Sequence, residues 1–351
     1  MMINNYLTID VEDYFQVSAF EECVTHKGWE SYPSRVENNT ERILSLLEKH
    51  QVKGTFFILG WTAEKFPQLV KKISSKGHEI ACHSYYHRLV YNLTPEEFRQ
   101  DTRKAKDVLE QITGRPVLGY RAPSYSITKN SLWALHILRE LGFNYSSSVF
   151  PVYHDRYGMP DAPRYPFLWN LDSTTPQIVD IKGETVREIL DYFATEALSG
   201  TVNKTSSLLL EIPISTSLVF KKNLPVSGGG YFRLFPYWFT RRALQQINNK
   251  EKKPFIFYLH PWEVDPEQPR MANVTPRSRF RHYLNLHRTY DRLQQLLHDF
   301  SFIPIDSQRN GLENTSKAKT SNDVSPAAAN TLCESRKAPP EIPPFQLFRR
   351  R

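Results

Sequence analysis

The chain has 351 residues, of which 40% are hydrophobic, 13% aromatic and 23% charged, a composition that excludes a wholly disordered protein. The formal net charge is +8 at pH 7, and residues 308–351, with eight basic and four acidic side chains, carry half of it. The rest is too small and too scattered for a dedicated nucleic-acid surface. Three cysteines, odd in number and far apart, form neither a disulfide framework nor a CxxC metal site.

No stretch approaches the roughly 18 uninterrupted apolar residues that a membrane span needs. The opening sequence, MMINNYLTIDVEDYF, lacks the basic and apolar regions of a signal peptide. The sequence therefore predicts a cytoplasmic protein without a transmembrane segment.

Short β-rich runs alternate with amphipathic stretches up to about residue 260. In chain order, strands are predicted at residues 6–10, 54–60, 79–82, 116–121, 177–181, 207–212 and 254–259. Helices are predicted at residues 41–50, 94–112, 130–141, 184–195 and 239–249, the second of them starting at a TPEE capping box. This alternation predicts an α/β fold with a parallel sheet, either a barrel or a doubly wound sheet.

The pattern changes after these elements. Residues 276–298 read as one basic amphipathic helix and residues 302–304 as a last short strand, and both are expected to pack on the barrel. Beyond residue 307 the chain is rich in Asn, Ser, Thr, Ala, Lys and Pro, which predicts a disordered tail. The predicted organisation is a barrel in residues 1–275, a C-terminal helix and strand in 276–307, and the tail in 308–351.

Four polar residues fall at the carboxyl ends of predicted strands: Asp10, His83, Arg121 and His260. In parallel α/β folds this edge of the sheet is where functional sites are built. We therefore expect these four side chains to share one site.

Two further patterns indicate a metal. His83 and His87 are spaced i, i+4 and can offer two imidazoles to one ion. Asp10, Glu12 and Asp13 place three carboxylates within four residues, and these repel one another unless a cation or protons compensate. Each pattern alone has an ordinary structural explanation, but together they predict one divalent ion. The ligand types favour Zn²⁺, followed by Co²⁺, Ni²⁺ or Fe²⁺.

The motifs TIDVED, HSYYH, RAPSY and LHPW, in this order, resemble the homology motifs of the NodB-type polysaccharide deacetylases (carbohydrate esterase family 4). The DVEDYF opening, the GGGYFRLFPY segment and the HPWE ending most resemble the branch associated with exopolysaccharide gene clusters and the exosortase (PEP-CTERM) system. The resemblance covers roughly residues 5–305.

This resemblance implies a distorted (β/α)7 barrel with one divalent ion. It implies a hydrolase that removes N-acetyl groups from an N-acetylated glycan or a lipid-linked oligosaccharide, in loose association with exopolysaccharide assembly proteins. Transferred to this chain, the family's catalytic base is Asp10, Arg121 pairs with that base, and His260 is the general acid. His83 and His87 become the two histidine ligands.

The carboxylate ligand stays open between two residues. The common family motif has this carboxylate directly after the base, where the present chain has Val11. Strand alternation places Glu12 on the same side as Asp10 and favours Glu12, whereas a sharp turn of the chain would favour Asp13.

Tyr125, Tyr231 and Trp262 are candidate substrate contacts, because aromatic faces stack on sugar rings, although core packing explains the aromatic segment around Tyr231 equally well. Two histidines and a carboxylate also describe non-haem iron oxygenases, but those need a jelly roll of antiparallel strands. The sequence is also compatible with a hydrolase of a small non-peptide amide and with a non-catalytic glycan-binding barrel.

Overall fold

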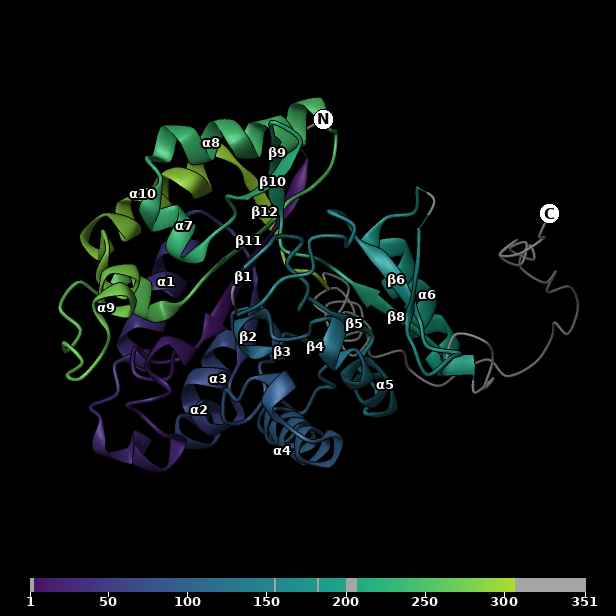
Figure 1. The fold of residues 1–351 in the computed structure, drawn as a ribbon, viewed down its shortest axis with the longest axis horizontal. Coiled ribbons are helices and arrows are strands. Elements are labelled where there is room, and N and C mark those ends of the chain that lie inside the picture. The colour runs from purple at the N-terminus through teal and green to yellow at the C-terminus, as the bar shows by residue number, and fades with distance from the viewer. Residues whose placement is uncertain (1–2, 155, 182, 200–206, 307–351) are drawn as a thin grey trace, which may run out of the picture. The chain divides into compact units, whose positions relative to one another are not determined.

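The computed structural model describes residues 3–154, 156–181, 183–199 and 207–306 (Figure 1). The predicted tail, residues 308–351, lies outside these residues. The strands are β1 (Asn4–Val11), β2 (Thr55–Ile58), β3 (Glu79–Cys82), β4 (Gly119–Tyr120), β5 (Tyr145–Ser146), β6 (Phe167–Asn170), β7 (Gln177–Val179), β8 (Leu208–Glu211), β9 (Thr216–Val219), β10 (Lys222–Pro225), β11 (Ile256–Leu259) and β12 (Ser301–Ile303). The α-helices are α1 (Val36–Lys49), α2 (Gly60–Lys65), α3 (Pro67–Ser75), α4 (Pro95–Thr113), α5 (Trp133–Glu140), α6 (Val186–Ser199), α7 (Gly229–Leu234), α8 (Tyr237–Gln245), α9 (Pro276–Tyr283) and α10 (Leu286–Asp299).

The predicted α/β fold with a parallel sheet is confirmed. Seven strands pair in parallel in the order β11-β1-β2-β3-β4-β5-β8, and helices connect most of them. β6 and β7 extend the sheet beyond β8 as antiparallel strands, and β12 pairs in parallel with the first residues of β1. β1 therefore lies inside the sheet, between neighbours that come from both ends of the described chain.

The two end strands of the parallel set, β8 and β11, are linked by side chains. The backbone N–H of Ile256 donates to the Oγ of Ser215, just beyond β8, at 2.9 Å, and the Oγ of Ser227 donates to the carbonyl of Ser215 at 2.6 Å. The sheet thus curls into a barrel with an irregular seam at this point.

Alternation along β1 separates the core into two parts. Leu7, Ile9 and Val11 belong to a large apolar cluster shared with α1, α3 and α4, on the outside of the barrel. Tyr6 belongs to a second cluster with interior residues of β2, β3, β8 and β11, and Asp10 has the same parity as Tyr6. This parity aims Asp10 into the barrel instead of toward the helices.

A glycine closes the barrel seam. Gly228 bridges to Tyr258 of β11 with φ +135°, and a Cβ at this position would lie 1.9 Å from the carbonyl oxygen of Tyr258. Such a backbone conformation and such an approach are open to glycine alone.

Gly228→Ala is therefore expected to lower the free energy of unfolding by about 3 kcal/mol, since it combines a steric clash with an unfavourable φ. The matched control is Gly230→Ala in the same glycine run, where the nearest atom to an added Cβ is an Arg233 side-chain nitrogen at 3.9 Å. Urea unfolding of both variants measures the difference, and equal losses would contradict the role given to Gly228.

Two predictions about elements need correction. The single helix predicted for residues 276–298 is two helices, because Asn285 adopts φ +52° and turns the chain between α9 and α10. The strand predicted at residues 177–181 is β7, an antiparallel edge strand, and not a strand of the parallel set. Among the described residues, no helix combines the length and apolar character needed to cross a membrane.

Candidate active site

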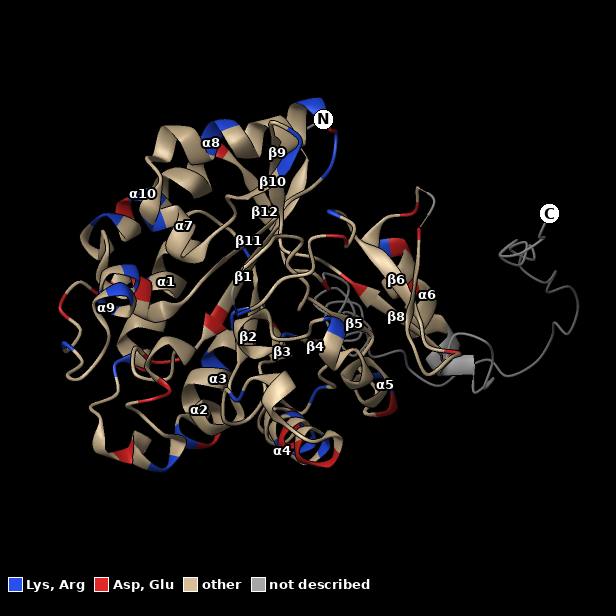
Figure 2. Cartoon of the chain, viewed as in Figure 1, with Lys and Arg blue, Asp and Glu red and all other residues tan. Residues whose placement is uncertain are grey.

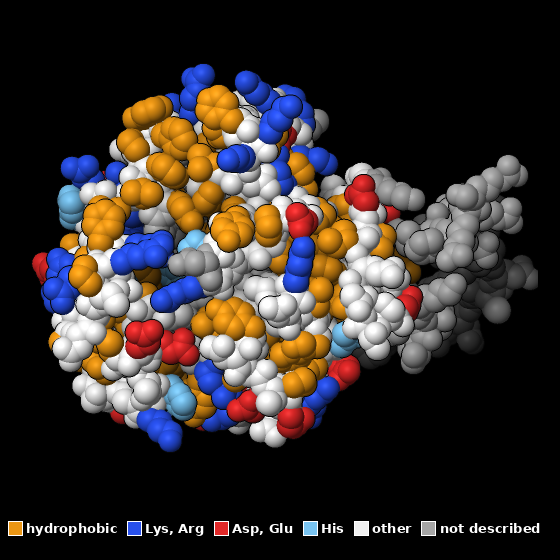
Figure 3. Space-filling model, in the orientation of Figure 1, with side chains coloured by type: hydrophobic (Ala, Val, Ile, Leu, Met, Phe, Trp, Pro, Cys, Tyr) orange, Lys and Arg blue, Asp and Glu red, His pale blue; other side chains and the backbone are white. Residues whose placement is uncertain are grey.

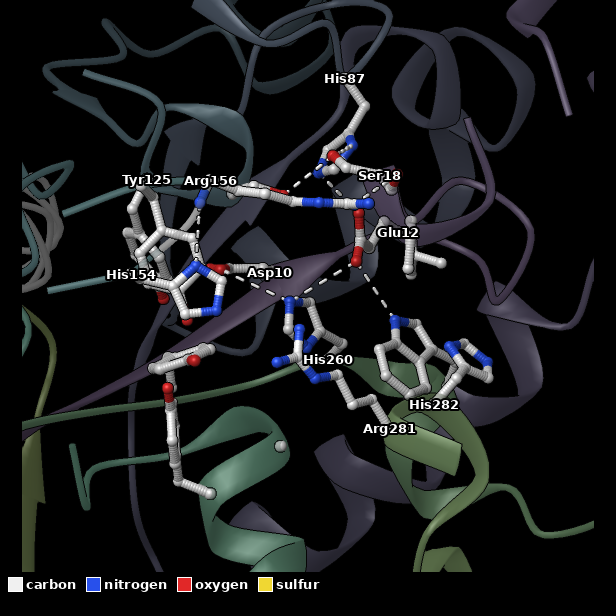
Figure 4. A pocket seen from close by; sticks show the side chains of 18 of the residues that line it. Asp10, Glu12, Ser18, His87, Tyr125, His154, Arg156, His260, Arg281 and His282 are labelled. Carbon is white, nitrogen blue, oxygen red and sulfur yellow. Dashed lines mark hydrogen bonds and ion pairs between the residues drawn. The ribbon is translucent and has the colours of Figure 1, made fainter. Parts of the chain in front are cut away.

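The strand-end residues predicted to share a site do so. Asp10 lies in β1 near its end, while His83, Arg121 and His260 directly follow β3, β4 and β11. Asp10, His83 and His260 line a cavity of about 430 Å³, in which Figure 4 labels Asp10 and His260. Arg121 is buried and pairs with Asp10.

Glu12, His83 and His87 form a compact group beside Asp10. Each offers one ligand atom, these atoms all lie within 4.8 Å of one another, and all three side chains are buried. Glu12 Oε2 lies 2.8 Å from His87 Nε2, yet this oxygen makes no hydrogen bond of acceptable geometry within the described residues. A buried carboxylate oxygen facing two imidazoles in this way suits a shared cation.

The protonation states also suit a cation. His83 Nδ1 lies 2.8 Å from the carbonyl oxygen of Arg121, to which it can only donate, so the lone pair is on Nε2. Burial is the main cause that lowers the pKa of His83, to about 4, which keeps this ring neutral. Burial alone would raise the pKa of Glu12. The surrounding histidines lower this pKa by more than burial raises it, to about 2, so that Glu12 is an ionised carboxylate.

The HSYYH segment is held in an unusual backbone shape. Ser84 and His87 have φ of +65° and +53°, and the N–H groups of Tyr85 and Tyr86 donate to the carboxylate of Asp101 on α4 at 2.7 and 3.3 Å. This anchoring brings both histidines to one place although their i, i+4 spacing does not lie on a helix.

The structure places the two candidate carboxylates apart. Asp13 accepts hydrogen bonds from the backbone N–H groups of Tyr14, Arg35 and Val36 and from the hydroxyl of Ser34, so its carboxylate caps the start of α1. Glu12 is the carboxylate that lies with His83 and His87.

Arg121 fixes the direction of Asp10. Its Nη1 donates to Asp10 Oδ1 at 2.5 Å and to Thr8 Oγ1 at 2.8 Å, while its Nε and Nη2 donate to Ser147. The other carboxylate oxygen of Asp10, Oδ2, lies 3.9 Å from His260 Nε2 and faces the cavity.

His260 lies between carboxylates. Its Nε2 is 3.5 Å from Glu12 Oε1, and its Nδ1 is 2.7 Å from Oε1 of Glu263, three residues later in the same turn. Burial lowers the pKa of His260, but Glu12 and Glu263 raise it more, to about 9. Glu263 is itself buried and paired with the Nε of Arg233 at 2.6 Å.

The three candidate substrate contacts, Tyr125, Tyr231 and Trp262, all line the cavity. Trp262 is stacked between His260 and His282 and donates its Nε1 to Glu12 Oε1 at 3.2 Å, which holds Glu12 in place. Tyr125 is buried with φ +54°, and Tyr231 is half-buried.

Sequence reasoning missed three functional neighbours: Glu263, Arg233 and the supporting role of Trp262. The HPWE motif carried a usable signal, because a carboxylate three residues after a histidine at a turn can return to its ring. The contact of Arg233 with Glu263 had no local signal, since 30 positions separate them.

Comparison with known proteins finds similarity to deacetylases. Residues 26–146 match the family model for polysaccharide deacetylases, and residues 191–309 match the model of a domain of unknown function, DUF3473. The chain is 40% identical over 96 residues to a peptidoglycan-N-acetylglucosamine deacetylase from Bacillus cereus, an alignment that covers 27% of this chain and 35% of the relative. It is 31% identical over 104 residues to the peptidoglycan-N-acetylmuramic acid deacetylase PdaA of Bacillus subtilis, covering 30% of this chain and 39% of the relative.

The chain thus spans about a third of the length of these curated relatives. A solved structure from Mycobacterium smegmatis, provisionally assigned as a polysaccharide deacetylase, has a TM-score of 0.50 and 16% identity, and the match covers 93% of this chain and 99% of that one. That likeness concerns the fold. Residues 26–146 are thus similar to the polysaccharide deacetylase family, and the parallel sheet of the described residues differs from the antiparallel jelly roll that an oxygenase would need.

Proposed function

We propose that the chain is a metal-dependent N-deacetylase that hydrolyses the acetamido group of an amino sugar, in a polysaccharide or its lipid-linked precursor, during exopolysaccharide biosynthesis. The observation that carries this proposal is the placement of Glu12, His83 and His87 beside Asp10 and His260 in one cavity. The relatives named as deacetylases, and the resemblance of the motifs, support the same reaction class.

The donor set fits a divalent cation, since one buried carboxylate oxygen and two imidazoles converge. Glu12, through Oε2, His83 and His87 would hold it, and the ligand types favour Zn²⁺ over harder cations. When bound, such a cation supplies a water of lowered pKa and polarises the acetamido oxygen. Trp262, by donating to Oε1 of Glu12, leaves Oε2 directed at the two histidines.

Asp10 and His260 would divide the proton transfers. Arg121 occupies one oxygen of Asp10, so the other, Oδ2, is the one that accepts the proton of the attacking water. His260 Nε2 then donates its proton to the sugar nitrogen as the C–N bond breaks, because an amine anion is too basic to leave unprotonated. The products are acetate and the free amino sugar, which balances the addition of one water.

The test is acetate release by the full chain after removal of bound metal and reloading with Zn²⁺, over neutral and lipid-linked N-acetylated sugars. Acetate is expected only from the reloaded protein. If a fully loaded, folded protein releases acetate from none of these sugars, a glycan-binding barrel without catalysis replaces the proposal.

Glu12→Ala and Asp13→Ala separate the two carboxylates. Loss of Glu12 is expected to lower Zn²⁺ affinity at least 100-fold, roughly the upper part of the range seen when a metal site is damaged. Loss of Asp13 is expected to keep the metal but to lower the free energy of unfolding by about 1–3 kcal/mol, because buried N–H donors at the start of α1 lose their acceptor. Equal Zn²⁺ affinities, measured by competition with a chelating dye, would remove Glu12 from the site.

A further inference from the structure

The cavity becomes positively charged toward its opening. Four arginines line it, and its only carboxylates among the described lining residues are Asp10 and Glu12 at the floor. Asp10 is already paired with Arg121, and the lining residue Arg233 is already paired with Glu263. An excess of cationic charge is therefore left at the mouth.

Arg156 and Arg281 carry this excess from two sides. Both are exposed residues, and neither forms an ion pair with another residue that the structure describes. Figure 4 shows Arg156 reaching across toward Ser18, whose carbonyl oxygen accepts from its Nη1 at 3.3 Å, whereas Arg281 extends toward His260. Among the described residues, the hydrogen-bond partner of the Arg156 guanidinium is this neutral carbonyl, and no carboxylate pairs with it.

The position of Arg281 is fixed by the fold. Arg233 Nη1, on α7, donates to the carbonyl oxygens of Arg281, His282 and Leu284. Because Arg233 also pairs with Glu263, it connects the backbone at the end of α9 to the turn that carries His260. Figure 2 shows basic residues on α9, and one of them, Arg277, lines the same cavity. Arg281, near the end of α9, and Arg156, in the loop before β6, line this cavity together with Tyr157.

Outside the arginines the mouth is apolar. Leu234 of α7 and Phe280 of α9 line the cavity although they are 49% and 60% exposed. In Figure 3 hydrophobic side chains gather over α7, α8 and α9, next to basic side chains. Single exposed apolar residues are common, but a group at the rim of a cavity indicates a binding surface.

The cavity thus has three layers: metal and acid–base groups at the floor, arginines above them, and apolar residues at the rim. We propose that its substrate is an N-acetylated amino sugar joined through a phosphate to an apolar chain. Guanidinium groups bind phosphate through charge-assisted hydrogen bonds, and Leu234 and Phe280 would contact the first part of the chain. This inference rests on the proposed deacetylase function and selects the lipid-linked precursor over the neutral polymer.

The test compares three substrates with the same N-acetyl sugar: its methyl glycoside, its 1-phosphate, and its 1-phosphate esterified with a decyl chain. The value of kcat/KM is expected to rise about 10- to 100-fold on adding the phosphate, the worth of charge-assisted contacts. It is expected to rise again with the chain. Arg156→Gln and Arg281→Gln should each reduce the preference for phosphate over methyl glycoside by about 10-fold, through KM, and Phe280→Ser should reduce the preference for the chain.

Arg279→Gln is the matched control, since this arginine is exposed on the same helix and does not line the cavity. Binding of decyl phosphate to the metal-free full chain, measured by calorimetry, is a second readout that does not need turnover. It should weaken at least about 10-fold in the Arg156→Gln/Arg281→Gln double variant and not in the control.

Equal kcat/KM on all three substrates, with no effect of the arginine variants, overturns the inference and leaves the deacetylase proposal standing. A higher kcat/KM for a nucleotide-linked sugar than for the decyl ester contradicts the proposed binding of an apolar chain by Leu234 and Phe280. Absence of acetate from every substrate, with decyl phosphate still bound, contradicts the deacetylase function instead.

Discussion

Replacing His260 with alanine is expected to lower turnover of an N-acetylated sugar by about 10²–10⁴-fold, the usual worth of a positioned general acid. The protein should stay folded and keep its metal, because the ligand group of Glu12, His83 and His87 does not include His260. Single-turnover rates and metal content of the same sample measure both properties.

His260 could instead serve only to pack beside Pro261 and against the stacked ring of Trp262. That role predicts a less stable variant of nearly normal activity once folded. The acid role also predicts a smaller loss on an activated ester, whose leaving group departs without a proton. An equal loss on amide and ester would assign His260 to positioning.

The general-acid role of His260 also predicts how the rate changes with pH. A general acid works below its pKa, so the rate falls as pH rises through the pKa of His260, which Glu12 and Glu263 raise. A cation bound at Glu12 offsets part of that rise, which places the alkaline limb of the loaded protein below pH 9. Glu263→Gln removes the anion at Nδ1 and should move the limb to lower pH.

Arg233→Met breaks the same buried ion pair but leaves the carboxylate of Glu263, whose charge is then less compensated. This variant should move the alkaline limb to higher pH. Because both variants break the pair, they share its cost in stability, and opposite shifts separate electrostatics from folding. Shifts in the same direction would contradict the pairing of Glu263 with His260 as the cause.

The second large effect is expected when both proposed histidine ligands are removed. His83→Ala/His87→Ala is expected to abolish stoichiometric metal binding and to remove activity entirely, since a single carboxylate cannot hold a divalent ion against water. Elemental analysis after dialysis should find about one metal per chain in the unmodified protein and none in this variant. His287→Ala/His298→Ala on α10 is the control, because both rings are exposed far along the chain from the ligand group. Full metal occupancy in the His83→Ala/His87→Ala variant would rule out this site.

The sequence predicted the parallel strands well where they are long and apolar. β3 has the bounds predicted, and the capping box at the start of α4 is present, with Thr94 accepting from the N–H of Glu97. The predictions were poorer where pairing is brief. The strand predicted at residues 116–121 is only the two-residue β4, and the two-residue β5 was not predicted, because two residues are too few to show a period. The break at Asn285 was also missed, because α9 and α10 are both basic and amphipathic, and only a positive φ separates them.

The site shows a similar division. Strand ends identified Asp10, His83, Arg121 and His260, because the carboxyl edge of a parallel sheet gathers residues that are distant in sequence. The choice between Glu12 and Asp13 needed the start of α1, whose N–H groups engage Asp13. No local sequence pattern predicts that Asp13 accepts hydrogen bonds from N–H groups 22 and 23 positions later in the chain.

The place of β1 has a consequence for how the chain is made. It precedes the other described strands in the chain, yet two of its three partners, β11 and β12, follow all the others, and the Oγ1 of Thr8 donates to the carbonyl of Phe257, 249 positions away. Until those strands emerge, one edge of β1 has no partner, and an open edge invites pairing with other chains. A chain truncated before residue 256 would therefore carry the histidine pair and the carboxylates without His260, on an open sheet that lacks β11 and is prone to aggregate.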